Sequence, residues 1–143
     1  PLMRVEEMYL IKAEGLAKSN QVAQAKQVLS DFVKTYRDPA YDINSITRSL
    51  EDEIWFQRRV ELWGEGFFTI DAKRLGKNIV RFHNNKHSNV PDAFKFNIKY
   101  NAPWLNMRFP STEMDNNLDI IDNVGGTQPE AGQNPELRDG VTD

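Results

Sequence analysis

The stretch 50–76 reads LEDEIWFQRRVELWGEGFFTIDAKRLG and decides how the chain folds. Ser49 stands just before it and Asp52 follows three residues later, which is the S-x-x-D signal of a capped helix start. We predict a helix from there through about Trp63, where two glycines interrupt the pattern. A further short helix is expected over 67–75, because a glycine follows it directly.

The apolar residues of the first of these two helices do not form one stripe. On a helical wheel Phe56, Val60 and Trp63 share one side, whereas Trp55 and Leu62 share another. Three charged residues stand between them: Arg58, Arg59 and Glu61. We therefore expect a helix that is enclosed on several sides, with its charges paired and both tryptophans in the core.

A helix hairpin is predicted over 1–39. Residues 3–18 read as one helix, Asn20 is the expected N-cap of the next, and residues 21–36 carry one clean apolar stripe. Small and large residues follow an approximately tetratricopeptide-like register: Tyr9, Ala13, Leu16, Ala25, Leu29, Phe32 and Pro39. The first helix has apolar residues around much of its circumference, so we expect one of its faces to remain uncovered by the second.

The second half of the chain carries weaker signals. Residues 94–100 alternate between apolar and polar, and 104–109 could return after a turn, which predicts a short β-hairpin within 93–110. Residues 111–143 are polar and are expected to form an irregular tail. The fold class is therefore mainly α in a single domain over 1–143.

Composition excludes several classes of protein. The 143 residues carry a net charge of −3 and no cysteine, which argues against a general nucleic-acid binder and excludes disulfides, thiol nucleophiles and Cys-ligated metals. No apolar run approaches the roughly 20 residues of a membrane-spanning helix.

The stretch 50–76 resembles the C-terminal signature of the SusD/RagB family, approximately I-x-x-E-R-R-x-E-L-x-x-E-G-x-R-x-x-D-L-x-R-x-G. The positions that carry this resemblance are Ile54, Arg58, Arg59, Glu61, Leu62, Glu65, Gly66, Asp71, Arg74 and Gly76. Three further segments resemble the family in the same order: RVEEMYLIKAE at 4–14, FPSTEMDNN at 109–117 and QNP at 133–135. Gln57, Phe68 and Ala72 depart from the usual Glu, Arg and Leu, which puts one customary ion pair in doubt.

The resemblance implies a function without catalysis. SusD-like proteins are lipid-anchored to the outer face of the outer membrane, where they bind glycans or other nutrients for a SusC-type TonB-dependent transporter. They use no cofactor and are built on tetratricopeptide-like helix pairs. Because family members are much longer, we expect this chain to be the C-terminal part, with the leader, the lipid-attachment cysteine and most helix pairs before Pro1.

The charged residues of the signature have two interpretations. The cluster is Arg58, Arg59, Glu61, Glu65, Asp71 and Arg74. Paired carboxylates resemble a glycosidase site, but the i,i+3 spacing of Arg58 with Glu61 and of Asp71 with Arg74 favours structural ion pairs. In the family this motif is architectural.

Ligand-binding candidates come from the aromatic residues. Tyr100 and Trp104 flank the predicted turn and could stack on sugar rings, and Asn101 could hydrogen-bond hydroxyl groups. His83 and His87 are four residues apart, but no carboxylate stands close by and no helix is evident, so we predict a solvated loop without a metal. Without the family motifs, helix-hairpin repeats would instead favour a protein–protein interaction module.

Overall fold

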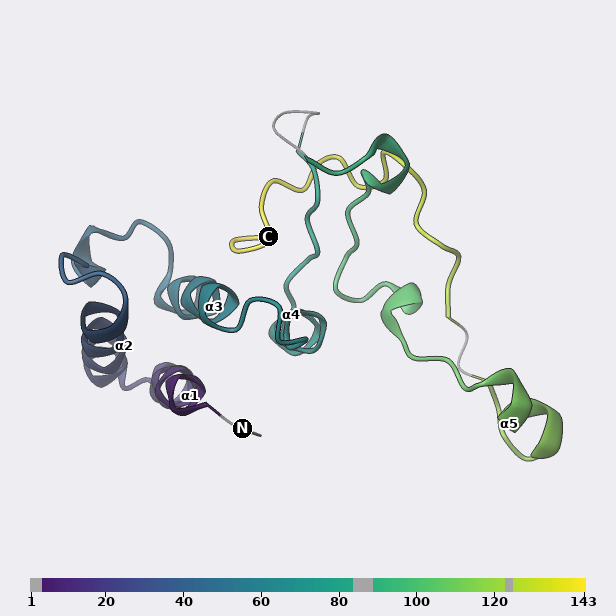
Figure 1. The fold of residues 1–143 in the computed structure, drawn as a ribbon, viewed down its shortest axis with the longest axis horizontal. Helices are drawn as coiled ribbons and strands as arrows, with labels where there is room; N and C mark the ends of the chain where they lie inside the picture. Colours follow the sequence, from purple (N-terminus) through teal and green to yellow (C-terminus); the bar gives the residue numbers. More distant parts are fainter. Residues whose placement is uncertain (1–3, 84–88, 123–124) are drawn as a thin grey trace. The chain divides into compact units, whose positions relative to one another are not determined.

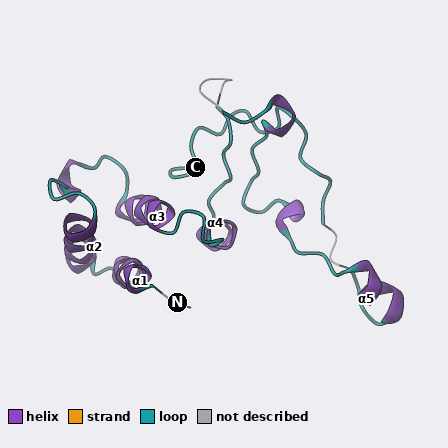
Figure 2. Cartoon of the chain, viewed as in Figure 1, coloured by secondary structure: helices purple, strands orange, loops and turns teal. Residues whose placement is uncertain are grey.

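The computed structural model describes residues 4–83, 89–122 and 125–143. The chain forms two compact units, one of residues 1–68 with Thr142 and one of residues 69–141 with Asp143. Figures 1 and 2 show that the regular elements of the described residues are helices separated by long loops. The mainly helical fold class is thereby confirmed.

The first unit is built on an antiparallel helix pair, α1 (Val5–Lys18) and α2 (Val22–Tyr36). Ala13 and Ala25 are completely buried, which lets helix backbones approach closely. The rings of Tyr9 and Tyr36 pack on Phe32, with centroids 5.9 and 5.6 Å from its centroid. The helix hairpin predicted from the apolar stripe is present, while its tetratricopeptide-like detail stays a prediction.

The turn between these helices differs from the expectation. Asn20 does not cap α2, because it adopts a left-handed backbone with φ of 61° and the N-cap position falls on Gln21. Its neighbour Gln21 donates its backbone N–H to the carbonyl of Leu16 at 2.9 Å, closing the end of α1. Asparagine tolerates this conformation better than most residues, so here it terminates one helix instead of starting the next.

Helix α3 (Leu50–Glu61) packs mainly against α1. The predicted cap is confirmed, since the Ser49 hydroxyl accepts the backbone N–H of Asp52 at 3.1 Å. A short 3-10 turn, η1 (Ile43–Ser45), precedes the helix. Helix α3 contributes Ile54 to the hydrophobic core of this unit. The buried residues of that core are Leu10, Ala13, Leu29, Phe32, Val33, Tyr41 and Ile54.

The two tryptophans of the signature have different environments. Trp55 is 2% exposed and stacks on Phe68 with ring centroids 5.8 Å apart, as its place in the core predicted. Trp63 is 85% exposed, so its predicted burial is wrong. The helix ends at Glu61 and Gly64 has φ of +79°, so Trp63 lies in the turn beyond the helix, where the wheel no longer applies.

The second unit begins at Thr69, so it contains all of α4 (Phe68–Leu75) except the first residue of that helix. It also contains the short helix α5 (Ser111–Asn116) and the 3-10 turns η2 (Asp92–Phe94) and η3 (Pro103–Leu105). Helix α4 ends at Leu75 and is followed by Gly76 with φ of +70°, the glycine that predicted its end. The β-hairpin expected over 93–110 is not confirmed, because no residue of that range lies in a strand. Ile98 instead forms an isolated antiparallel bridge with Ile79.

A buried asparagine explains why the alternating pattern did not form a hairpin. Asn97 is completely buried, and its side chain accepts the backbone N–H groups of Arg81 and Phe82 at 2.7 and 3.2 Å. It also donates to the carbonyls of Phe82 and Asn134 at 3.0 and 2.9 Å, and Asn134 donates back to the Asn97 carbonyl at 2.8 Å. The segment therefore bonds to 79–82 and 133–134, and part of the expected irregular tail packs into the core of this unit.

Candidate functional site

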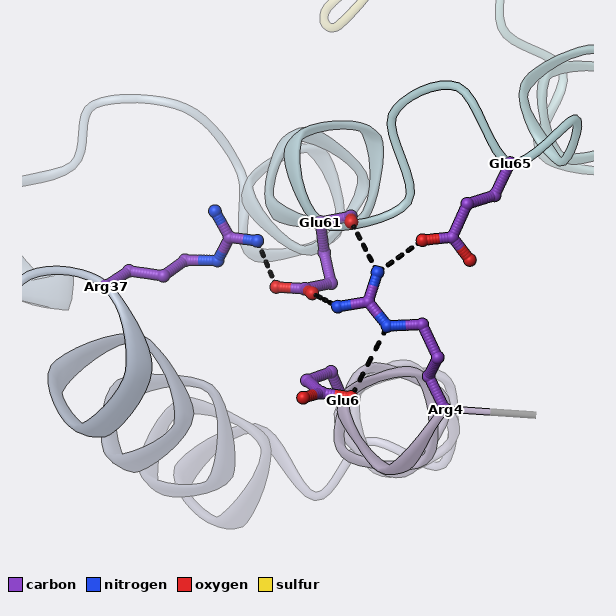
Figure 3. Close-up of polar contacts among 5 residues, drawn as sticks. All are labelled: Arg4, Glu6, Arg37, Glu61 and Glu65. Carbon is purple, nitrogen blue, oxygen red and sulfur yellow. Dashed lines mark hydrogen bonds and ion pairs between the residues drawn. The ribbon is translucent and has the colours of Figure 1, made fainter. Parts of the chain in front are cut away.

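The most connected charged cluster lies where α1 begins, α2 ends and α3 ends. Figure 3 shows the Glu61 carboxylate between the guanidinium groups of Arg4 and Arg37, which bind one oxygen each. Arg4 also binds Glu65 and approaches Glu6 at 3.5 Å. The side chain of Glu61 is only 5% exposed, so the cluster joins three helix ends through one buried carboxylate.

The electrostatics of this cluster suit structure better than catalysis. The hydrogen bond to Glu65, with the nearby charge of Glu61, raises the pKa of the Arg4 guanidinium above its usual range. Both carboxylate oxygens of Glu61 are engaged by arginines, Arg4 and Arg37. A glycosidase needs one carboxyl group that can donate a proton to the substrate.

The two adjacent arginines of the signature have different surroundings. Arg58 is 5% exposed and binds Glu7 of α1, with Nη2 and Oε1 2.9 Å apart. Arg59 is half-buried and lies over the rings of Trp55 and Phe68, at 5.6 and 5.2 Å from their centroids. One arginine thus ties α3 to α1, and the other covers the stacked aromatic pair.

The remaining signature pair lies on α4. Arg74 donates through Nε to Asp71 at 2.8 Å, at the i,i+3 spacing expected from the sequence. Asp71 is 4% exposed, whereas the Arg74 side chain is 40% exposed. This contact therefore pairs a buried carboxylate with a partly solvated guanidinium. Ala72 beside it is completely buried.

The most deeply buried carboxylate, that of Glu53, escaped the sequence analysis. Glu53 is 1% exposed and accepts hydrogen bonds from Tyr41 and Gln57 through Oε1, each at 2.8 Å, while Arg48 Nε lies 2.7 Å from Oε2. Burial and the hydrogen bond to Glu53 raise the pKa of the Tyr41 hydroxyl. Gln57, where the family usually has Glu, thus places a neutral donor beside a buried carboxyl group. The only feature of the sequence that pointed to this buried group was Gln57 in place of the family's usual Glu.

The candidate ligand-binding residues lie on a turn in the second unit. Tyr100 and Trp104 are 43% and 42% exposed, and Asn101 is exposed. The turn is fixed by the Ala102 N–H donating to Lys99 O at 2.9 Å. Two large aromatic surfaces on one ordered turn are available for stacking with a ligand.

Neighbouring side chains support this turn. Asn78 Oδ1 accepts the backbone N–H of Tyr100 at 3.0 Å. Asn106 Oδ1 accepts a hydrogen bond from Lys73 Nζ of α4 at 2.6 Å. The turn is thus held from α4 and from the segment that follows it.

The described residues contain no cluster of side chains that could hold a metal ion. No group of three His, Asp or Glu side chains there is placed to hold an ion. His83 Nδ1 lies 3.1 Å from the carbonyl oxygen of Leu137, and His87 lies outside the described residues. Among these same residues, no helix has the length and apolar character needed to cross a membrane.

Comparison with known proteins gives one result. Neither the curated proteins nor the solved structures contain a match to this chain. The family model described as the SusD family matches residues 1–133. Because the match covers nearly the whole sequence, the chain belongs to the SusD family.

Proposed function

We propose that this chain belongs to a non-catalytic surface protein that binds glycans or other nutrients and delivers them to a SusC-type TonB-dependent transporter. The observation that carries the proposal is the family match over 1–133, since the family suggests nutrient binding at the cell surface. On this proposal the protein is held at the outer face of the outer membrane by a lipid anchor outside this chain.

The proposed ligand contacts are Tyr100, Asn101 and Trp104. Partly exposed aromatic rings favour sugar binding, because a ring face packs on the apolar face of a pyranose while neighbouring amides meet the hydroxyl groups. The hydrogen-bonded turn supports the assignment, since a fixed backbone lowers the entropic cost of holding two aromatic side chains for a ligand.

Calorimetric titration with a panel of soluble oligosaccharides tests this assignment. Trp104→Ala should weaken binding about tenfold, because the loss of one stacked ring costs up to about 1.5 kcal/mol. Trp63→Ala is the matched control, since Trp63 is also an exposed tryptophan but lies in the other unit. Equal affinities for the wild type and Trp104→Ala would remove Trp104 from the site.

The absence of catalysis has its own test. Incubation with the same glycans followed by product chromatography should release no oligosaccharide, because Glu61 and Glu65 are engaged by Arg4. Product release that disappears in Glu61→Gln or Glu65→Gln would contradict the proposal and support a glycoside hydrolase.

A protein–protein interaction module is the second candidate function. It is favoured by the exposed apolar side chains of α1, of which Val5 is 66% and Ile11 is 47% exposed. Binding to a protein or peptide with no affinity for any nutrient would select this alternative.

A further inference from the structure

The last part of the described chain, residues 125–143, packs on the turn that carries the proposed ligand contacts. The aromatic turn comprises residues 99–106, and the C-terminal segment comprises 125–143. The segment has an irregular backbone, but its side chains Leu137 and Val141 are each only 9% exposed. Burial of such apolar side chains holds an irregular segment on the rest of its unit. Its contacts with the aromatic turn are therefore part of the packing of the second unit.

The first of these contacts lies just before the aromatic turn. Asn97 donates its backbone N–H to the carbonyl of Gln133 at 3.0 Å. Its side chain donates to the Asn134 carbonyl at 2.9 Å, and the Asn134 side chain donates back to the Asn97 carbonyl at 2.8 Å. Asn134 adopts a left-handed backbone with φ of 52°, which asparagine tolerates better than most residues. Three hydrogen bonds thus fix the chain two residues before the turn begins.

A second contact reaches the turn through Asn78. The backbone N–H of Asn78 donates to the main-chain oxygen of Asp143 at 3.2 Å, and its side-chain oxygen accepts the backbone N–H of Tyr100 at 3.0 Å. The C-terminal segment therefore supports the residue that holds the backbone of Tyr100. Glu136 also lies 3.2 Å from Lys99, but both side chains are more than half exposed, so this ion pair contributes little.

A third contact lies against the backbone of Trp104. A Cβ built on Gly126 would be 3.2 Å from the Cβ of Pro103 and 3.6 Å from the backbone nitrogen of Trp104. Two carbon atoms in ordinary contact are roughly 3.5–4.0 Å apart, so only glycine fits at position 126 without displacing Pro103. The C-terminal segment consequently contacts the chain at Trp104 as well as the chain before Tyr100.

We propose that the C-terminal segment positions Tyr100 and Trp104 for the ligand, with Gly126 and Asn134 as positioning residues. Ordering a flexible backbone costs conformational entropy, so a turn that is already held loses less when a ligand binds. The ligand role of the two aromatic residues rests on the proposed function. The support of the turn rests on the contacts alone, so the two can be tested separately.

Fluorine NMR of protein labelled with fluorotryptophan measures the order of the turn without any ligand. The three tryptophans give three signals, which single substitutions to phenylalanine assign, and Trp55 and Trp63 are internal controls in the other unit. Asn134→Asp keeps the size of the side chain but removes the amide group that donates to Asn97. The Trp104 signal should shift or broaden, and the other two signals should stay unchanged.

Gly126→Ala provides a second variant that removes no hydrogen-bonding side chain. Its added methyl group would press on Pro103, so the Trp104 signal should shift here too. Gly15→Ala is the matched control, because a Cβ at that position of α1 has nothing within 4 Å. An unchanged Trp104 signal in both Asn134→Asp and Gly126→Ala would overturn the inference.

Calorimetric titration with the oligosaccharide panel then measures the consequence for binding. At a temperature well below the melting transition of each variant, Asn134→Asp and Gly126→Ala should weaken binding about threefold or more, while Gly15→Ala should bind as the wild type does. A purely structural role would lower the melting temperature and leave the affinity of the folded protein unchanged, and that result would overturn the inference.

Failure of the proposed function has a different outcome. If the wild type binds no glycan, the ligand role of Tyr100 and Trp104 is wrong, and the positioning of these residues for a ligand is wrong with it. The fluorine signals would still decide whether the C-terminal segment holds the aromatic turn. Glycan binding that Trp104→Ala weakens and both Asn134→Asp and Gly126→Ala leave unchanged would instead preserve the proposed function and overturn the inference alone.

Discussion

Arg58→Ala should destabilise the protein more than any other single substitution in the signature. The guanidinium lies 2.9 Å from the Glu7 carboxylate, and the two side chains are only 6% and 12% exposed. Removing one partner of a buried pair leaves the other charge without compensation and costs about 3–5 kcal/mol. Domains of ordinary size are stable by about 5–15 kcal/mol, so this loss would be a large share of the free energy of unfolding.

Urea unfolding followed by circular dichroism measures this loss, with the slope m checked for changes in the unfolded state. Arg59→Ala is the matched control one residue away, and it should cost about 1 kcal/mol, because Arg59 is half-buried over Trp55. Arg58→Met combined with Glu7→Leu should recover much of the stability, since both charges leave together. The reasoning is refuted if Arg58→Ala costs less than about 0.5 kcal/mol, the range of exposed sites.

Three further predictions concern the other buried polar groups. Gln57→Glu should cost about 1–3 kcal/mol in urea unfolding, because it replaces a hydrogen-bond donor to buried Glu53 with a second carboxyl group. The pKa of Tyr41 is raised in the folded state, so unfolding releases a proton above about pH 10, the pKa of an unfolded tyrosine. The wild type should therefore lose stability above that pH relative to Tyr41→Phe, as measured by unfolding curves at a series of pH values. Asn97→Ala should lower the free energy of unfolding by about 2 kcal/mol or more by removing the partners of buried backbone groups, whereas exposed Asn101→Ala should leave thermal unfolding unchanged.

The features that sequence predicted correctly depend on neighbouring residues. The cap of α3 joins Ser49 to Asp52, and the stripe of α2 buries Leu29, Phe32 and Val33 through helical spacing alone. Local sequence determines such contacts because the helix itself brings the residues together.

The features that sequence missed depend on distant segments or on exceptions to a pattern. Glu61 meets Arg4 across 57 positions of the chain, and no spacing rule reports that contact. Asn97 is buried because its side-chain amide forms hydrogen bonds with backbone groups of two other segments. In an alternating stretch a polar residue is normally expected to face solvent, so the pattern predicted the opposite. Trp63 was misplaced because α3 ended two residues earlier than expected.

The candidate site shows the same division. The family match and the identities of Tyr100, Asn101 and Trp104 follow from sequence, whereas the exposure of both rings and the fixing of their turn required coordinates. The roles of these residues and the single-domain organisation stay predictions.

The composition of the chain around α5 also determines where proteases can cut it. Lys and Arg are absent from Phe109 through Leu137, so trypsin has no site there and would release one peptide ending at Arg138. Chymotrypsin-like enzymes, by contrast, meet Leu118 with its side chain 95% exposed. Cleavage at this residue consequently serves as a footprint. A protein bound over α5 and the turn after it would slow chymotrypsin selectively, and trypsin would still release the peptide 109–138.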